Sequence, residues 1–132
     1  MSQETKIVIS VLDISADCVD EITASLQCTP SRITSAQVRK RREMAWTYDI
    51  ASGSFSSGKR IENKLNEFLE ANAARIRELS KRFRIEVDFT LIDDGSPSFG
   101  RVSLSTQTLA NIAATGAHLG VGLISAEKVE AG

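Results

Sequence analysis

The chain has 132 residues, 42% of them hydrophobic and 25% charged, and its net charge is −1. This is the composition of an ordinary globular protein, and the length allows one domain with a sizeable core. No segment approaches the roughly 18 uncharged apolar residues of a membrane-spanning helix, and residues 1–10 lack the hydrophobic region of a signal peptide. We therefore expect a single cytoplasmic domain of bacterial type over residues 1–132, with a loose tail over about 125–132.

The first predicted elements are a strand and a helix. Residues 6–12 (KIVISVL) are apolar enough for a central strand. Ser15 is a plausible N-cap of the helix that follows, and Pro30 requires that helix to end near Gln27 or Cys28. Residues 31–42 are polar and basic, and we expect them to form a loop.

The middle of the chain predicts a second strand and a long helix. Apolar residues alternate with small or polar ones over residues 44–50, so Trp46 and Tyr48 are expected to face the core. A Ser/Gly stretch over residues 52–58 interrupts this strand. Apolar residues then recur at helical spacing over residues 61–83, which predicts one amphipathic helix of about six turns.

The last third predicts a hairpin, a helix and a final strand. Residues 85–92 alternate, which places Glu86 and Asp88 on the face of the sheet that also carries Asp49. Turn residues link this strand to a predicted partner strand over 101–105. A third helix is expected to end with Gly116 at its C′ position, followed by a strand over 119–123.

These elements predict an α+β domain in the order β-α-β-α-β-β-α-β. Both outer units place a helix between two strands, which favours parallel right-handed crossovers. We expect a ferredoxin-like two-layer sandwich, with a mixed sheet of about five strands and the helices on one face.

The order of features resembles an uncharacterised bacterial single-domain family of the domain-of-unknown-function series. The resemblance rests on the stretch from Leu26 to Pro30, the tryptophan strand, and the terminal pattern VSLSTQTLANIAATGAHLGVGLI. Gln27 stands where members carry glycine, and Gly122 where the last strand usually carries an aspartate. The resemblance covers nearly the whole chain and implies an α+β domain of the kind encoded among bacterial interaction or toxin-immunity systems.

The stretch GSFSSGKR, residues 53–60, has the glycine and lysine spacing of a phosphate-binding P-loop. A working P-loop needs Ser or Thr after the lysine to hold magnesium, but Arg60 occupies that position. It also follows a strand buried on both faces, whereas residues 44–50 are one-sided. Two interpretations remain for Gly58, Lys59 and Arg60: a loop before a helix that starts nearer Glu62, or a site for a small anion.

Basic residues gather in the middle of the chain. Residues 32–84 carry thirteen basic and six acidic side chains, while both flanking segments are acidic overall. The densest run is Arg39, Lys40, Arg41 and Arg42, which we name the basic cluster. It is a solvated loop, a site for an acidic protein partner, or a nucleic-acid site, and the acidic residues expected on the neighbouring sheet face make nucleic acid the least favoured partner.

No catalytic, metal or cofactor site is expected. Cys18 and Cys28 are predicted to be buried thiols too far apart for a disulfide, and His118 is the only histidine. The leading functional hypothesis is therefore a non-enzymatic binding module that meets an acidic partner through the basic cluster. The alternative is a small-anion or small-ligand site in residues 53–60, and an enzyme is the least favoured class.

A homodimer through the sheet face is a further possibility raised by the sequence. Val8, Leu12 and Ile92 would present apolar side chains there, and Gly120 and Gly122 would leave the last strand bare.

Overall fold

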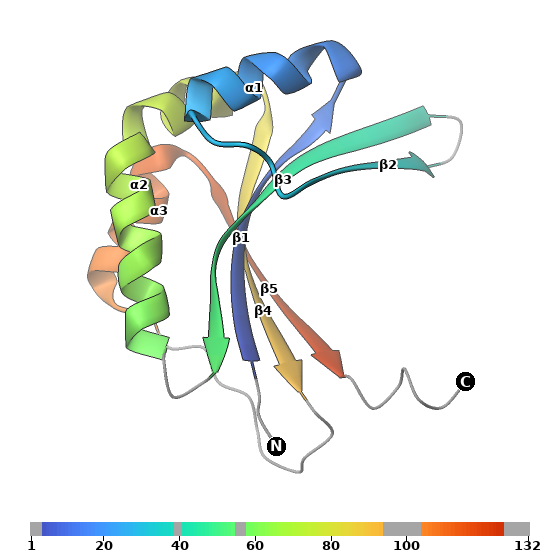
Figure 1. The fold of residues 1–132 in the computed structure, drawn as a ribbon. Coiled ribbons are helices and arrows are strands. Elements are labelled where there is room, and N and C mark those ends of the chain that lie inside the picture. The colour runs from blue at the N-terminus through green and yellow to red at the C-terminus, as the bar shows by residue number, and fades with distance from the viewer. Residues whose placement is uncertain (1–3, 39–40, 55–57, 94–103, 126–132) are drawn as a thin grey trace.

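The computed structural model describes residues 4–38, 41–54, 58–93 and 104–125, with the backbone alone at 36–38, 41–42, 58, 93 and 123–125. Its elements in chain order are β1 (Glu4–Ile14), a short 3-10 helix η1 (Ala16–Cys18), α1 (Val19–Leu26), β2 (Arg32–Val38), β3 (Arg41–Ser54), α2 (Gly58–Ser80), β4 (Arg84–Asp93), α3 (Thr106–Thr115) and β5 (His118–Ser125). Figure 1 shows them as a curved sheet with α2 and α3 against one face and α1 across one end.

The sheet has five strands in the order β2-β3-β1-β4-β5. β1 is antiparallel to both β3 and β4, and β2 is antiparallel to β3, while β5 runs parallel to β4 through the α3 crossover. The predicted α+β class with a mixed sheet of about five strands is therefore confirmed. The ferredoxin-like character is not confirmed, and the predicted order β-α-β-α-β-β-α-β differs from the described order, which is β-α-β-β-α-β-α-β.

Two expectations about individual segments need correction. The predicted loop at 31–42 is wrong, because residues 32–38 form β2 and β3 already begins at Arg41. Of the predicted strand at 101–105, residues 101–103 lie outside the described residues, and Leu104 and Ser105 precede α3, with Ser105 as its N-cap. The expected tail over 125–132 also lies outside them, apart from Ser125 at the end of β5.

The hydrophobic core lies between the helices and one face of the sheet. Alternate residues of β1 and β4 supply its floor, since Ile7, Ile9 and Val11 are at most 1% exposed and lie opposite Phe89, Val87 and Ile85 in the register. The helices contribute the other side through Ile22, Leu26, Ile61, Leu65, Leu69, Ile76, Leu79 and Ile112. This one-sided burial explains why the alternating patterns in the sequence predicted strands correctly.

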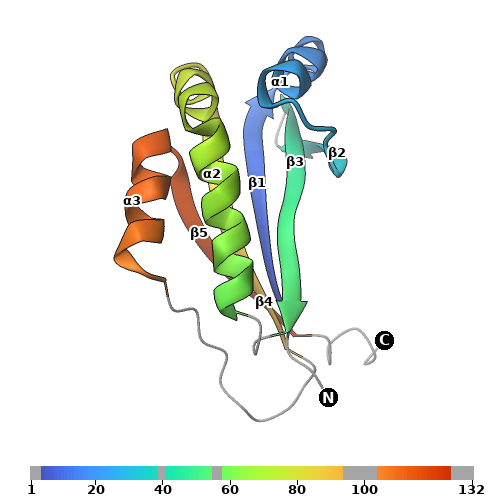
Figure 2. The ribbon, with the colours of Figure 1, turned by 60° about the vertical axis from the view of Figure 1, so that its left-hand side comes forward.

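Hydrogen bonds between α2 and α3 set the position of α3 beside β5 (Figure 2). Oε2 of Glu62 accepts from the backbone N–H of Ser105 at 2.8 Å and from Oγ1 of Thr108 at 2.5 Å. The amide of Asn66 donates to the same Thr108 hydroxyl at 3.0 Å and accepts from Asn111 at 2.9 Å. Burial alone would raise the pKa of Glu62, but these donors outweigh it and hold its pKa below the usual range.

Two helices end in the left-handed conformation, one at glycine and one at glutamine. Gly116 has φ 77° at the end of α3, which confirms its predicted C′ position. Gln27 has φ 55° at the end of α1, a conformation that costs an L-residue more than glycine.

Replacing Gly116 with alanine is expected to lower the free energy of unfolding by about 1 kcal/mol or more, because the left-handed backbone resists a side chain. The added Cβ would also lie 2.6 Å from Oγ of Ser80. Gln27→Gly is expected to act in the opposite direction and to stabilise by up to about 1 kcal/mol. Urea unfolding of both variants measures the two changes.

Gly122→Ala is the matched control, because an added Cβ there would meet nothing within 4 Å. Its free energy of unfolding should stay within about 0.5 kcal/mol of the parent chain. A Gly116→Ala variant no less stable than Gly122→Ala would contradict this account of the α3 terminus.

Candidate functional site

The basic cluster, residues 39–42, belongs to the connection between β2 and β3. Residues 39 and 40 lie outside the described residues, and the backbone of Arg41 and Arg42 forms the start of β3. The register pairs Arg41 with Val38 and Arg42 with Gln37. Arg41 and Arg42 therefore lie at the end of the β2–β3 pairing, and Figure 1 shows these two strands extending away from α2 and α3.

Ion pairs hold the base of the β2–β3 hairpin against β1. Asp49 of β3 lies 3.1 Å from Nη1 of Arg32 on β2 and 3.3 Å from Nζ of Lys6 on β1. The backbone N–H of Asp49 also donates to Oγ of Ser31 at 2.9 Å. Oδ1 of Asp49 is buried, and its contact with Arg32 is an ion pair without hydrogen-bond geometry, so this oxygen has no hydrogen-bond donor in the described part of the chain.

The described side chains of β2, residues 32–35, contribute little to the core. Residues 31–35 are all exposed, and Ile33 is 39% exposed. The strand is held by its backbone pairing with β3 and by the ion pairs at its base. This hairpin arm therefore presents its tip without being buried itself, which suits a surface that meets a partner.

The predicted anion site is at the start of α2. Gly53 and Ser54 end β3, residues 55–57 lie outside the described part, and α2 begins at Gly58. The expectation that Lys59 and Arg60 lie in a loop before the helix is wrong, because both are exposed residues of its first turn. The first turn holds no acidic residue, so two cations lie at the positive end of the helix dipole.

β3 also differs from the strand of a nucleotide-binding P-loop. It is antiparallel to both of its neighbours, whereas P-loops follow strands of parallel sheets. The direction of β3 therefore agrees with the sequence features that disfavour a nucleotide-binding P-loop at residues 53–60.

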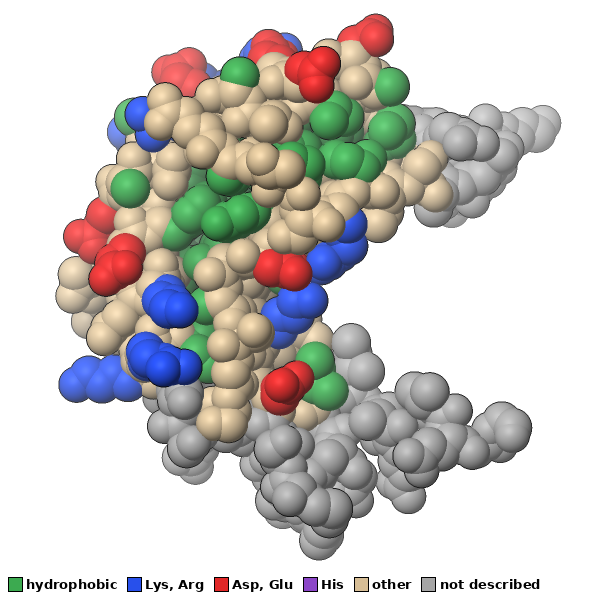
Figure 3. Space-filling model, in the orientation of Figure 1, with side chains coloured by type: hydrophobic (Ala, Val, Ile, Leu, Met, Phe, Trp, Pro, Cys, Tyr) green, Lys and Arg blue, Asp and Glu red, His purple; other side chains and the backbone are tan. Residues whose placement is uncertain are grey.

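Charged side chains cover the face of the sheet that the helices leave open. The register places Asp49 and Asp88 opposite Val8, and Glu86 opposite Ser10, which confirms that the three acids share one face. Figure 3 shows acidic and basic side chains close together in the hollow on this side of the molecule. Arg84 contributes a further ion pair, with its Nε 3.0 Å from Oε2 of Glu86.

Asp88 on this face has a raised pKa. Its partial burial raises its pKa above the ordinary 3.8, and the charge and hydrogen bond of Glu86 raise it further. Gly120 of β5 lies opposite, where an added Cβ would collide with Oδ1 of Asp88. The missing side chain at Gly120 thus leaves the space that this carboxyl group occupies.

The sheet register also brings His118 opposite Glu86. The sequence suggested no carboxylate partner for this histidine, because the two residues are 32 positions apart and meet only through the parallel pairing of β4 and β5. His118 is exposed.

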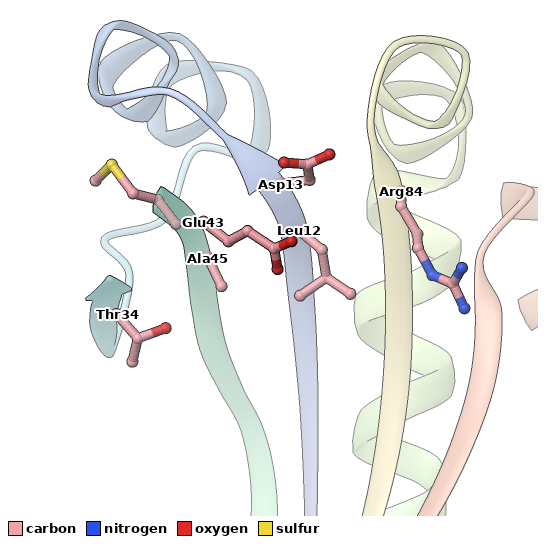
Figure 4. Close-up of a pocket in the computed structure, with 7 residues that line it drawn as sticks. Leu12, Asp13, Thr34, Glu43, Ala45 and Arg84 are labelled. Atoms are coloured by element: carbon pink, nitrogen blue, oxygen red, sulfur yellow. The ribbon is translucent and has the colours of Figure 1, made fainter. Parts of the chain in front are cut away.

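A pocket of about 380 Å³ opens at one end of the same face (Figure 4). It is lined by Leu12, Asp13, Thr34, Glu43, Met44, Ala45 and Arg84. A bulge in β1 creates part of its rim, since the register shifts between Leu12 and Ile14 and Asp13 has φ 55°. Figure 4 shows Glu43 extended toward Leu12, while the guanidinium of Arg84 points away from Glu43. The pocket therefore lacks a set of polar groups that converge on one ligand position.

The remaining sequence expectations concern cysteines, metals and membranes. Cys18 and Cys28 are both free and half-buried, and burial raises the pKa of Cys28. Among the described residues, no three His, Cys, Asp or Glu side chains are grouped to hold a metal ion. No helix in the described ranges is long and apolar enough to cross a membrane.

Comparison of the chain with protein-family models, with curated proteins and with solved structures found no match.

Replacing Asp88 with asparagine is expected to stabilise the protein at neutral pH. Folding raises the pKa of Asp88, so the native state binds this proton more tightly than the unfolded chain does. Native stability therefore falls as the pH rises from about the ordinary value of 3.8 through the raised native pKa. The asparagine side chain has no proton to lose, so urea unfolding at a series of pH values should show the advantage of Asp88→Asn growing over this window.

Glu86→Gln supplies the control, because it removes the neighbour that helps to raise the pKa of Asp88. Carboxyl NMR should then show Asp88 titrating at lower pH than in the parent chain. An Asp88→Asn variant that is destabilised equally at every pH would show instead that the carboxylate stabilises the fold.

Proposed function

We propose that this protein is a non-enzymatic binding module that meets an acidic protein partner through the basic cluster at the tip of the β2–β3 hairpin. The main observation in support of this proposal is the pairing register of β2 with β3. The residues opposite Arg41 and Arg42 are Val38 and Gln37, so neither arginine has an acidic cross-strand partner. Opposite charges on paired strand residues attract each other, and the described register gives neither arginine such a partner.

The base of the hairpin supports the same proposal. Its ion pairs use Lys6, Arg32 and Asp49 and so consume basic charge near the core, while the cluster lies beyond them along the arm. A fixed base lowers the conformational entropy that would be lost when the tip binds. An acidic surface or acidic peptide segment is the partner that complements four consecutive cations.

The resemblance in the sequence is consistent with this kind of role. It implies a domain from bacterial interaction or toxin-immunity systems. We therefore extend the proposal to an immunity-like role, in which the acidic partner is a protein of such a system. The left-handed conformation at Gln27 supports the resemblance, because it is the position where members of that family carry glycine.

The double variant Arg41→Glu and Arg42→Glu is expected to weaken binding of a polyglutamate probe by about tenfold or more, because repulsion replaces attraction at the hairpin tip. Binding by the parent chain should decrease with added salt, as screening requires. Isothermal titration calorimetry at low and moderate ionic strength measures both effects.

Lys59→Glu and Arg60→Glu together form the matched control, with the same change in net charge at the start of α2. Equal losses in both double variants would show that only net charge matters and would overturn the assignment to the hairpin. A single-stranded DNA probe bound more tightly than polyglutamate would indicate a nucleic-acid site instead.

A second candidate function is binding of a small anion by Gly58, Lys59 and Arg60. It is supported by the placement of two exposed cations in the first turn of α2, where the helix dipole disfavours them and where backbone N–H groups lack helical partners. An anion bound there would contact both the side chains and these N–H groups.

Titration with inorganic phosphate or sulfate tests this second function. The backbone amide NMR signals of residues 58–60 should shift with saturation, and the Lys59→Glu, Arg60→Glu variant should lose the shift. That variant should also be more stable by about 0.3–1 kcal/mol for each reversed charge, because acids favour the first turn of a helix. Unchanged signals at residues 58–60 in the parent chain would remove the anion site.

A further inference from the structure

Large apolar side chains are exposed mainly at one edge of the protein. The described residues include four such side chains: Ile33 at 39%, Leu109 at 44%, Leu119 at 43% and Val121 at 62% exposure. Leu119 and Val121 belong to β5, and Leu109 belongs to the helix that precedes it. Exposed apolar groups scattered singly need no explanation, but three on adjacent elements form a patch.

Leu119 and Val121 face the helix layer and yet remain uncovered. The register places them beside Val87 and Phe89, both of which are at most 2% exposed. Residues paired in a ladder point to the same face of the sheet. The helices therefore cover β4 fully but leave the outer part of β5 open on the side where its apolar side chains point.

Leu109 lies on the side of α3 that is turned away from α2. Thr108 and Asn111 bond to residues of α2, and Ile112 enters the core. Around the helix, Leu109 follows Thr108 and Ile112 in the direction away from Asn111, at about 100° per residue. Since α3 lies on the β5 side of α2 (Figure 2), this places Leu109 at the same edge as Leu119 and Val121.

β5 is an edge strand without the usual protection of such strands. It is last in the sheet order, and β4 is its only neighbour among the described strands. Residues 118–125 (HLGVGLIS) contain no Lys, Arg, Asp, Glu or Pro. Charges, proline and short length are the devices that keep exposed edges from pairing with other chains. The opposite edge differs, because β2 begins with the ion-paired Arg32 and ends at the basic cluster.

We propose that the β5 edge binds a second copy of this chain, by antiparallel pairing of β5 with β5 about a two-fold axis at Val121. In this register Val121 lies opposite Val121 of the second copy, Leu119 opposite position 123, and Gly120 opposite position 122. The leucine and valine positions then share one face and the glycines the other. In a two-fold symmetric interface the same surface of both copies is in contact, so apolar positions must lie opposite apolar positions. The alternation in HLGVGLIS meets this requirement.

The charges nearest the junction also permit self-pairing. Glu86 and Asp88 belong to β4, so two copies of β5 separate them from the corresponding acids of the second chain. Glycine at positions 120 and 122 leaves space on that face of the junction, where Asp88 already lies over Gly120. A slip of one residue would place glycine opposite leucine and turn the second helix layer to the other face, so the apolar pattern disfavours that register.

The dimer extends the sheet through both copies and leaves each β2–β3 hairpin at an outer edge. A dimer therefore presents two basic clusters at opposite ends, and it can bind two acidic sites with enhanced avidity. Pairing at β5 does not depend on the function proposed for the hairpin, so the two ideas can fail separately.

Sedimentation velocity and light scattering of the full chain over a wide concentration range test the proposal. The parent chain should show a monomer–dimer equilibrium. Val121→Lys should weaken the dimer by about tenfold or more, because it places like charges directly opposite each other in the ladder. Val121 is 62% exposed, so circular dichroism should show that this variant remains folded.

Two further variants locate the interface. Ile33→Lys changes a similarly exposed apolar residue on the opposite edge strand, and it should leave the dimer unchanged. Val121→Lys mixed with Val121→Glu should restore a dimer that neither variant forms alone, because the axis brings these positions together. A monomeric parent chain would overturn the proposal and leave the edge to a strand of another protein. Loss of the dimer in Ile33→Lys, or its persistence in both Val121 variants, would also overturn it, as would failure of the mixture to associate.

Discussion

The fully buried indole of Trp46 connects the sheet to both of the helices that cover β3. Its ring N–H donates to Oγ1 of Thr23 on α1 at 3.0 Å. The ring stacks on Tyr48, and Tyr48 stacks on Phe68 of α2 at a centroid distance of 5.4 Å. Because side chains alternate along a strand, burying Trp46 also assigns Thr47 and Asp49 to the open face. The ion pairs at the base of the hairpin depend on that assignment.

The two faces and the two edges of the sheet have different chemistry. One face is apolar and covered by helices, while the open face pairs Asp49 with Lys6 and Arg32, and Glu86 with Arg84. Exposed ion pairs of this kind add little stability, and they leave no strong net field for a partner. The two edges carry other features: the sequence of the β2–β3 connection is basic, and β5 exposes the apolar side chains Leu119 and Val121. The two proposed interactions use these separate edges, so they do not compete.

Several parts of the fold followed from the sequence, and the reasons are local. Alternation over 44–50 and 85–92 reports burial on one face, and it holds whichever strand is the neighbour. The position of Gly116 after the last turn of α3 was predicted correctly, because the left-handed end of a helix strongly favours glycine. β2 was missed because residues 31–35 are all exposed and show no burial pattern. A strand that is held mainly by backbone pairing with one neighbour does not need alternating apolar and polar residues, so its sequence does not reveal it.

The candidate sites also differ in how far the sequence could predict them. The basic cluster and the lysine–arginine pair after Gly58 were visible in the sequence because their members are adjacent in the chain. The sequence by itself determined which residues of β1, β3 and β4 face the core, where α3 ends, and where positive charge gathers. Only the tertiary structure decided that Asp49 bridges Lys6 and Arg32, that His118 meets Glu86, and that β5 is an edge. These features join residues that are distant in sequence, and strand order and direction depend on how all the elements pack together, which no single segment encodes.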